Sequence, residues 1–386
     1  MKKLFALLLC GVILCGLAAC GESPVPADSD SSASSGEVSD SATGDSVASS
    51  DEADASDTSD EEEVKIPVFD PAVDHKIIMD VSARGILVVD LDETGDHPEN
   101  WSVEDGIIWE WSTDDLTEGK MKGVSVTMDS ARLRYSPYYE SDVIVFCGSG
   151  GWVGVVDYAT KELLFEDNPG KGPHSAELLP NGDLVLACSG NSNSEEGCVL
   201  YYPLSSGLTR STSTYPLISA HGVCYDPEQD VIWALGGYEI VALSVSGKGT
   251  EKAKISPVNG MGVKLPSNGG HELSPAYGHP GKYWVSGGKE VWVFDSVEGT
   301  ISATDLQAKK YTNKNVKGMA YFSDGTMVQT SHDQGGTGTY RSSLFRVMYL
   351  AESSGKIKTS VVKELMIPHA GDYQSYKVDV FCKDYQ

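Results

Sequence analysis

The pattern of apolar and polar positions divides the chain into three stretches. An apolar run from Leu4 to Ala19 is followed by a polar stretch from Gly21 to Val64. From Lys65 onward, short apolar runs of strand length alternate with clusters of Gly, Pro, Asp and Asn. Alternation of this kind predicts many short β-strands joined by turns. The sequence therefore predicts an all-β domain over residues 65–386.

One short pattern recurs along this domain at intervals of about fifty residues, which indicates a repeat architecture. Each copy contains a polar residue near the start of an apolar strand, then a turn rich in Pro, Asp or Gly, then a second apolar strand. A third strand often follows a Gly-Gly turn, as at Gly150-Gly151 and Gly236-Gly237. The polar positions of the six copies are Asp80, Arg132, His174, His221, His271 and Lys317.

This rhythm is typical of the blades of a β-propeller, which bury their faces by stacking around an axis. We predict a six-bladed β-propeller. The segment from Tyr376 to Cys382 alternates like a strand, and we expect it to complete a terminal blade and close the ring. Seven blades stay possible, because the stretch between Asp92 and Val126 is long and Trp101–Trp111 has room for extra strands.

The first nineteen residues have the features of a signal peptide. Lys2 and Lys3 precede an apolar run that is short for a transmembrane helix. The run closes with Leu17-Ala18-Ala19-Cys20-Gly21, which matches the lipobox of bacterial lipoproteins. We therefore expect a signal peptide over 1–19, a lipid on Cys20, and an extracytoplasmic protein anchored to the outer face of a bacterial membrane. The alternative is an ordinary secretory signal that happens to contain a cysteine.

Residues 20–64 are predicted to form a disordered acidic tether. No Lys or Arg occurs between Gly21 and Val64, and few residues there can enter a core. The acidic side chains of this stretch supply about half of the net charge of −27. Binding of cations or of a basic partner is the alternative interpretation of the acidic run. The negative charge of the whole chain argues against nucleic acid as a partner.

The polar repeat positions predict a site on the propeller axis. Inner strands of a propeller begin at one rim of the central channel, so residues at the same repeat position converge there. Three histidines, an arginine and a lysine at these positions could hold a small anion or a metal ion. Imidazole is the commonest protein ligand of metals, and three histidines with one open position suit zinc or manganese. The alternative is that each histidine forms hydrogen bonds within its own blade.

Three phrases resemble those of a bacterial family of secreted six-bladed propellers of unknown function. They are Pro173-His174-Ser-Ala-Glu-Leu-Leu-Pro-Asn-Gly, His221-Gly-Val-Cys-Tyr-Asp-Pro and Met128-Asp-Ser-Ala-Arg132-Leu-Arg. The resemblance covers most of the chain from about Asp80 onward. More distantly, the arrangement is similar to the oligogalacturonate lyase propellers. In those proteins histidines and a glutamine hold manganese, while an arginine and a histidine serve β-elimination of a uronate.

The lyase resemblance implies a role for each candidate residue. The ligands of a divalent metal, manganese or zinc, would be His221, His271, His332 and Gln334. His174 would be the base and Arg132 its catalytic partner. The substrate carboxylate would contact Arg132 and Lys317, and Asp80 shares their repeat position.

The sequence thus supports a surface-anchored lipoprotein, expected to be a monomer, that binds or processes an acidic small molecule or a uronate-like carbohydrate. In a purely binding protein, Trp109, Trp111 and Trp152 could stack on sugars, although packing inside the blades is the favoured interpretation. A non-catalytic interaction scaffold is the remaining alternative. Five cysteines follow Cys20, and Cys188 and Cys198 flank a hairpin loop across which they could pair.

Overall fold

The computed structural model describes residues 72–386 apart from 83, 96–97, 125–126, 191–195, 289, 305, 307–315, 333–340, 353–356 and 369–373. Cys20, the predicted signal peptide, the predicted tether and Gln334 lie outside the described residues. The chain divides after Glu61, and everything described belongs to the second unit, Glu62–Gln386. In the described part, no helix is long and apolar enough to span a membrane.

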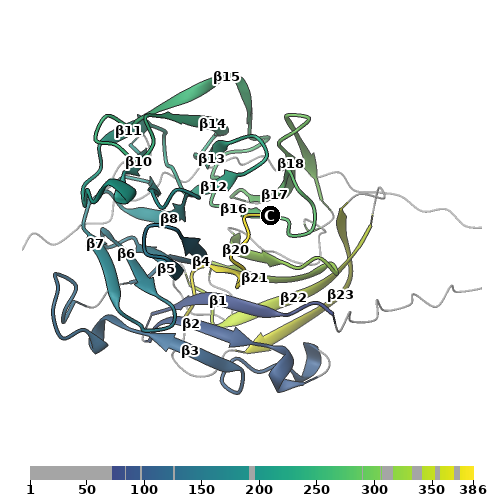
Figure 1. Ribbon diagram of the computed structural model, residues 1–386. Helices are drawn as coiled ribbons and strands as arrows, with labels where there is room; N and C mark the ends of the chain where they lie inside the picture. Colours follow the sequence, from purple (N-terminus) through teal and green to yellow (C-terminus); the bar gives the residue numbers. More distant parts are fainter. Residues whose placement is uncertain are drawn as a thin grey trace, which may run out of the picture. The chain divides into compact units, whose positions relative to one another are not determined.

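The strands of the described residues form six antiparallel sheets of four strands, which surround a common axis (Figure 1). Each sheet is one blade. Blade 1 contains β1 (Lys76–Val81), β2 (Gly85–Asp90), β3 (Ile107–Trp111) and β24 (Val378–Val380). Blade 2 contains β4 (Ser130–Ser136), β5 (Ser141–Gly148), β6 (Trp152–Asp157) and β7 (Leu163–Asp167). Blade 3 contains β8 (Pro173–Leu178), β9 (Leu184–Cys188), β10 (Cys198–Tyr202) and β11 (Ser213–Pro216).

The other three blades repeat the same order of strands. Blade 4 contains β12 (Gly222–Asp226), β13 (Val231–Leu235), β14 (Glu239–Ser246) and β15 (Lys254–Lys264). Blade 5 contains β16 (Glu272–Pro275), β17 (Lys282–Ser286), β18 (Val291–Asp295) and β19 (Thr300–Ala303). Blade 6 contains β20 (Val316–Tyr321), β21 (Thr326–Ser331), β22 (Leu344–Glu352) and β23 (Lys358–Pro368). The predicted six-bladed propeller is confirmed.

The long stretch between Asp92 and Val126 contains short 3-10 helices and one strand among its described residues. The helices are η1 (Asp92–Thr94), η2 (Pro98–Asn100) and η3 (Thr113–Asp115), and a fourth, η4 (Leu204–Ser206), lies in blade 3. The strand is β3, which pairs with β2 as the outer strand of blade 1. The alternative of a seventh blade is therefore wrong.

The ring closes between the two ends of the domain. β24 pairs antiparallel with β1, with Ile77 opposite Val380 and Met79 opposite Val378. The predicted closing role of the segment Tyr376–Cys382 is confirmed. β24, rather than β1, is the inner strand of blade 1. Ile77–Asp80 was expected to be the inner strand of its copy, and it is instead the second strand.

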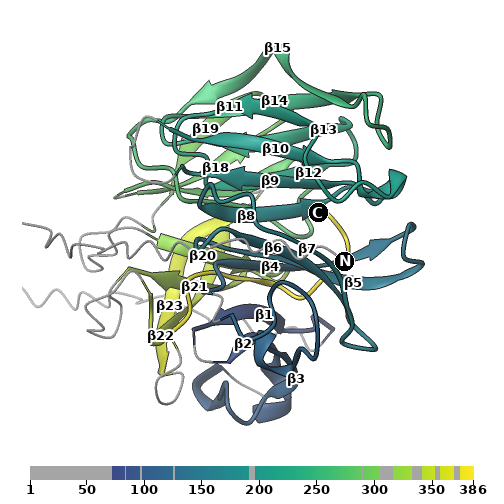
Figure 2. The same cartoon turned by 90° about the vertical axis from the view of Figure 1, so that its left-hand side faces the viewer.

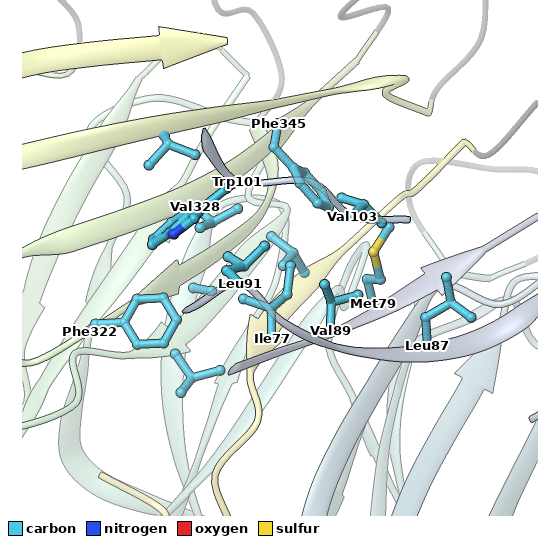
Figure 3. Packing of buried hydrophobic residues seen from close by; sticks show 14 of the residues in the cluster. Ile77, Met79, Leu87, Val89, Leu91, Trp101, Val103, Phe322, Val328 and Phe345 are labelled. Carbon is cyan, nitrogen blue, oxygen red and sulfur yellow. The ribbon is translucent and has the colours of Figure 1, made fainter. Parts of the chain in front are cut away.

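Apolar side chains fill the six interfaces between neighbouring blades. Successive side chains of a strand point to opposite faces, so each sheet packs against two neighbours and reads as a nearly continuous apolar run. Figure 2 shows β8 of blade 3 beside the strands of blade 2, of which it contacts β4, β5 and β6. Ile77, Met79, Phe322 and Phe345 belong to the cluster between blades 6 and 1 (Figure 3).

The tryptophans of blade 1 are part of this packing. Trp109 and Trp111 are buried between blades 1 and 2, and half-buried Trp152 packs against the same cluster. The indole nitrogen of Trp109 donates to the carbonyl of Tyr158 at 2.9 Å, and that of Trp111 donates to the carbonyl of Lys161 at 3.2 Å. The structure confirms the packing interpretation for Trp109 and Trp111.

Candidate functional site

A pocket of about 450 Å³ lies on the axis where the inner strands begin. All six blades contribute to its wall, because the start of each inner strand, or the loop beside it, reaches this point. The lining residues are Asp129, Ser149, His174, His221, His271, Lys317, Arg341, Gln374 and Tyr376. Four of the six predicted ring positions, His174, His221, His271 and Lys317, therefore meet in one pocket.

The register of the inner strands explains why Asp129 replaces Arg132 in the wall. The amide nitrogen of His221 donates to the carbonyl of Leu235, and that of His271 donates to the carbonyl of Ser286. Leu235 and Ser286 are the residues that pair with the first residues of β12 and β16. Asp129 makes the equivalent bond to Cys147 in blade 2. Asp129 is thus the structural counterpart of the two histidines. Arg132 lies three positions further along β4, so its alignment with the ring was wrong.

Arg132 and Asp80 are buried beside the pocket and do not line it. The Arg132 guanidinium donates to Glu177 at 3.1 Å, to Asp379 at 2.8 Å, and to the carbonyls of Val223 and Leu273. Asp80 accepts the backbone N–H groups of Tyr376 and Lys377 and binds Arg341. The structure therefore gives both residues internal partners and does not bring them to the pocket surface as substrate contacts.

A buried ion-pair network fills the axis beneath the pocket. Arg132 and Arg134 share Glu177, with distances of 3.1 Å and 2.7 Å. Lys377 Nζ lies 2.7 Å from Glu272 Oε2 and donates to the carbonyls of His221 and His271. A gap of only about 10 Å³ remains among Arg132, Glu272 and Lys377, roughly the space of one water. The network therefore forms the floor of the pocket.

Three imidazole rings form a row along one side of the pocket. The rings of His174 and His221 are stacked, with centroids 4.4 Å apart and an interplanar angle of 13°. The rings of His221 and His271 are 5.0 Å apart and tilted by 54°. Nδ1 lies 2.9 Å from the carbonyl of Ser219 in His221 and 2.6 Å from that of Gly269 in His271. A carbonyl only accepts, so Nδ1 carries the proton in both rings.

Both of these rings are uncharged. Burial lowers the pKa of His221 well below its ordinary value, and the neighbouring His174 lowers it further. Burial lowers the pKa of His271 to about 3, and Lys317 acts in the same direction. A neutral ring protonated at Nδ1 keeps a lone pair on Nε2. His221 and His271 therefore offer hydrogen-bond acceptors.

His174 is held by a hydrogen bond at one ring nitrogen, and its other ring nitrogen lies beside a carboxylate. Nε2 lies 3.0 Å from the hydroxyl of Ser189. Nδ1 lies 3.1 Å from Asp129 Oδ2, off the line of a direct hydrogen bond. Asp129 in turn accepts the amide of Ser149 at 2.8 Å and pairs with Arg341 at 3.0 Å. These contacts fix the ring of His174 against the wall.

The stacked rings of His174 and His221 are not arranged to share one metal ion. Lone pairs lie in the plane of an imidazole ring, so those of the stacked His174 and His221 run nearly parallel and do not converge on one ion. Among the described residues, the one cluster of three close acidic or histidine ligands is Asp74, Asp90 and Asp92. Lys76 Nζ already lies 2.8 Å from Asp74 and 3.2 Å from Asp90.

Of the implied manganese or zinc ligands, the described residues place His221 and His271 in the pocket. His332 directly follows β21 and is not among the described lining residues of the pocket. Gln334 lies outside the described residues. Of the four implied ligands, the described lining thus contains His221 and His271, and the metal site stays a prediction.

Two cations and an aromatic ring complete the pocket. Burial lowers the pKa of Lys317 to about 7, and the nearby Lys377 also lowers it. Lys317 Nζ lies 5.4 Å from the ring centroid of Tyr376, and the Arg341 guanidinium lies 5.8 Å from it. Arg341 also pairs with Asp80 and Asp129, which ties the wall to blades 1 and 2.

The repeat pattern missed five of the lining residues, which are Asp129, Ser149, Arg341, Gln374 and Tyr376. Asp129 was visible in the phrase Met128-Asp-Ser-Ala-Arg132, and only the ladder register distinguishes it from Arg132. Tyr376 was expected to be part of the closing strand, and the fact that this strand is innermost gives it its position. Arg341 and Gln374 belong to connections between strands, where no periodicity marks a residue.

Comparison with known proteins identifies the family of the chain. Residues 46–338 match a family described as "Family of unknown function (DUF6528)". The chain belongs to this family. The predicted resemblance to a propeller family of unknown function is confirmed. The match supports no resemblance to oligogalacturonate lyases, and no curated protein matches the chain.

Solved structures similar to this chain include propellers from distant sources. A protein of unknown function from Bacteroides caccae has 12% identity and a TM-score of 0.49, covering 79% of this chain and 98% of that one. A chain of a nidogen/laminin complex has 10% identity and a TM-score of 0.49, covering 80% and 99%. The β-propeller domain of Myceliophteria thermophila Cps50 (Swd1) has 10% identity and a TM-score of 0.44, covering 76% and 86%.

Proposed function

We propose that this propeller binds a small acidic solute, of the class of uronate carbohydrates, in its axial pocket. The observation that carries the proposal is the gathering of Lys317, Arg341 and three histidines in one pocket of a chain with a net charge of −27. Lys317 and Arg341 are the cationic side chains of this lining, and cations concentrated in a cavity attract an anion even when the protein as a whole is negative.

Lys317 favours the binding of a carboxylate in the pocket. Its pKa of about 7 means that burial makes the ammonium costly in the absence of a ligand. A carboxylate placed beside Lys317 would offset this cost, because opposite charges a few ångströms apart favour the charged form. Arg341 is already paired with Asp80 and Asp129, so it positions the wall more than it contributes charge.

The imidazoles of His221 and His271 suit the hydroxyl groups of a carbohydrate. Nε2 of His221 and Nε2 of His271 accept hydrogen bonds, and sugar hydroxyls donate them. A uronate carries both hydroxyls and a carboxylate, which suits neutral acceptors placed beside a cation. The pocket volume of about 450 Å³ lies within the range of small-molecule sites.

Calorimetric titration of the full chain with galacturonate and with neutral galactose tests this proposal. We expect binding of the uronate and at least about tenfold weaker binding of the neutral sugar, which corresponds to roughly 1.4 kcal/mol. Lys317→Met should abolish the difference between the two sugars. Lys264→Gln is the matched control, because this exposed lysine pairs with Glu239 on blade 4. Equal affinity for both sugars, or equal loss in the two variants, would contradict the proposal.

Proton abstraction is a second candidate function, and the pKa of Lys317 favours it. A lysine with a pKa of about 7 is partly neutral at physiological pH and can accept a proton, as a base in β-elimination of a uronate must. His174, the base implied by the lyase resemblance, has Ser189 and Asp129 at its two nitrogens. Formation of an ultraviolet-absorbing unsaturated product, lost in Lys317→Met, would favour the lyase; binding without product would favour the binding protein.

We propose in addition that Cys20 carries the lipid that attaches the chain to the outer face of a membrane. The proposal rests on the Leu17-Ala18-Ala19-Cys20-Gly21 sequence and the lysines before the apolar run. Detergent phase partition of cell extracts tests it. The wild-type chain should enter the detergent phase. A Cys20→Ala chain cannot carry the lipid, so it should stay in the aqueous phase. Equal partition of both chains would contradict the anchor.

A further inference from the structure

Cys188 and Cys198 lie directly opposite each other on neighbouring strands of blade 3. The last residue of β9 is Cys188, the first residue of β10 is Cys198, and the two form a cross-strand pair. Directly opposite residues of an antiparallel ladder have Cα atoms about 4.5 to 5.5 Å apart, which is within the range that a disulfide spans. Both are free cysteines in this structure.

Their side chains point to the same side of the sheet. Directly opposite residues share a face, and both cysteines belong to the apolar cluster between blades 2 and 3. Cys188 is fully buried, while Cys198 retains 7% of its surface. The exposed residue Lys171 lies beside the pair, with its Nζ 4.0 Å from Cys198 Sγ. The pair thus combines a buried thiol with one at the border of the solvent.

We propose that Cys188 and Cys198 form a redox-active dithiol, in which Cys198 beside Lys171 attacks and Cys188 resolves, giving a cross-strand disulfide. This site lies outside the axial pocket, so it does not depend on the proposed ligand. The oxidant is a small-molecule disulfide such as oxidised glutathione.

The reaction is a thiol–disulfide exchange in two steps. The Cys198 thiolate attacks one sulfur of the oxidant, which forms a mixed disulfide and releases the first thiolate. The Cys188 thiolate then attacks Cys198 Sγ, which forms the Cys188–Cys198 bond and releases the second. The two cysteines lose two electrons and two protons, and the oxidant is reduced to two thiols.

The two thiols differ in the way that these roles require. A hydrogen bond from Cys188 and the charge of Lys171 lower the pKa of Cys198, although burial opposes them. The same hydrogen bond and burial raise the pKa of Cys188 well above its ordinary value. Because the thiolate is the nucleophile, Cys198 is the one that reacts first. Burial raises the pKa of Cys224 to about 12 and that of Cys147 well above its ordinary value, so these thiols serve as internal controls.

Oxidation would also stiffen a segment next to the pocket. Ser189 follows Cys188, its amide donates to Gly172 at 2.9 Å, and its hydroxyl contacts His174. The amide of Gly190 donates to Lys171 at 2.9 Å. A disulfide at Cys188 would therefore fix the backbone that holds His174.

Peptide mapping of the full chain tests the proposal. The reduced protein is exposed to oxidised glutathione, its remaining thiols are alkylated, and it is cut with a Glu-specific protease. Glu195 and Glu196 lie between the two cysteines, so cleavage there separates them unless they are joined. We expect one pair of peptides linked through Cys188 and Cys198, with Cys147 and Cys224 alkylated only after unfolding. No Glu lies between Cys198 and Cys224, so fragment sequencing of the linked peptides must locate the bond at Cys198, and a bond at Cys224 would overturn the proposal. Alkylation of both Cys188 and Cys198, or linkage of either to Cys147, would overturn the proposal.

Single variants test the order of attack. Cys188→Ala should stop at a mixed disulfide between Cys198 and glutathione, while Cys198→Ala should leave Cys188 as a thiol. Lys171→Gln should slow oxidation at neutral pH by about three- to tenfold, because fewer Cys198 thiolates are present. The control Lys264→Gln should leave the rate unchanged. The reverse order of reactivity, or an unchanged rate in Lys171→Gln, would overturn the assigned roles.

Discussion

The axial pocket and the ion-pair network beneath it both consist of polar and charged side chains. The two regions differ in whether these side chains border an open volume. In the network, Arg132 donates to two carboxylates and two carbonyls, and Lys377 pairs with Glu272. In the pocket, neutral imidazoles and a lysine whose pKa is lowered to about 7 surround an open volume. The charges of the network are enclosed by their internal partners, whereas the polar groups of the pocket also border a volume that a ligand could enter.

Removal of Arg132 should have the largest effect. Arg132→Leu leaves Glu177 and Asp379 buried without this guanidinium, and the loss of one partner from a buried ion pair costs about 3 to 5 kcal/mol. The free energy of unfolding from urea titration measures the loss. The control Lys264→Gln should change it by less than about 0.5 kcal/mol. An Arg132→Leu protein with unchanged stability that had lost uronate binding would show that Arg132 contacts the ligand and is not a structural residue.

Lys317→Met should have the opposite effect on stability. The pKa of Lys317 falls from 10.5 to about 7 on folding, so the unfolded chain binds its proton more tightly. The cost to the folded state is present in full below about pH 7 and disappears as the pH rises above about 10.5. Replacing a buried charge with an apolar side chain should therefore stabilise the fold at pH 7, by about 1 to 4 kcal/mol. Urea titration at pH 7 checks this, and destabilisation would make Lys317 structural.

Uronate affinity should depend on pH in the direction set by Lys317. The anion binds the protonated ammonium, so affinity should be nearly constant below about pH 7 and fall by up to about tenfold per pH unit above it. His271, with a pKa of about 3, stays neutral throughout titrations between pH 5 and 9. Calorimetry at several pH values measures the profile. A profile that is flat in the wild type, or unchanged in Lys317→Met, would exclude Lys317 as the anion contact.

Trp109→Phe should have the smallest effect, since Trp109 belongs to neither region. The change removes the 2.9 Å hydrogen bond to Tyr158, which is worth about 1 kcal/mol. Affinity for the uronate should not change, because Trp109 packs between blades 1 and 2. Paired urea and binding titrations measure both quantities. A clear loss of affinity with unchanged stability would restore the sugar-stacking hypothesis.

The repeat pattern predicted the blades well because strand length, alternation and turn residues are local properties. It placed His174, His221, His271 and Lys317 together for the same reason, since each begins an inner strand after the same kind of loop. It failed at Arg132 because Asp129 and Arg132 stand near the start of one strand, and a cross-strand hydrogen bond decides between them. It failed at Asp80 because the inner strand of blade 1 comes from the other end of the domain. No local pattern could indicate Arg341, whose position depends on Asp80 and Asp129.

The closing strand also determines when the pocket can exist. Tyr376 and Lys377 directly precede β24, and they follow the other blades in the order of synthesis. Gly318, on the neighbouring inner strand β20, lies so close to Val378 that a Cβ on it would be 2.4 Å from the Val378 amide nitrogen. The pocket wall includes Tyr376 and the ion pair with Glu272 needs Lys377, so neither is complete before these residues are in place. If the proposed uronate binding is found, we expect it to require the completed ring, so that it would report on the maturation of the chain.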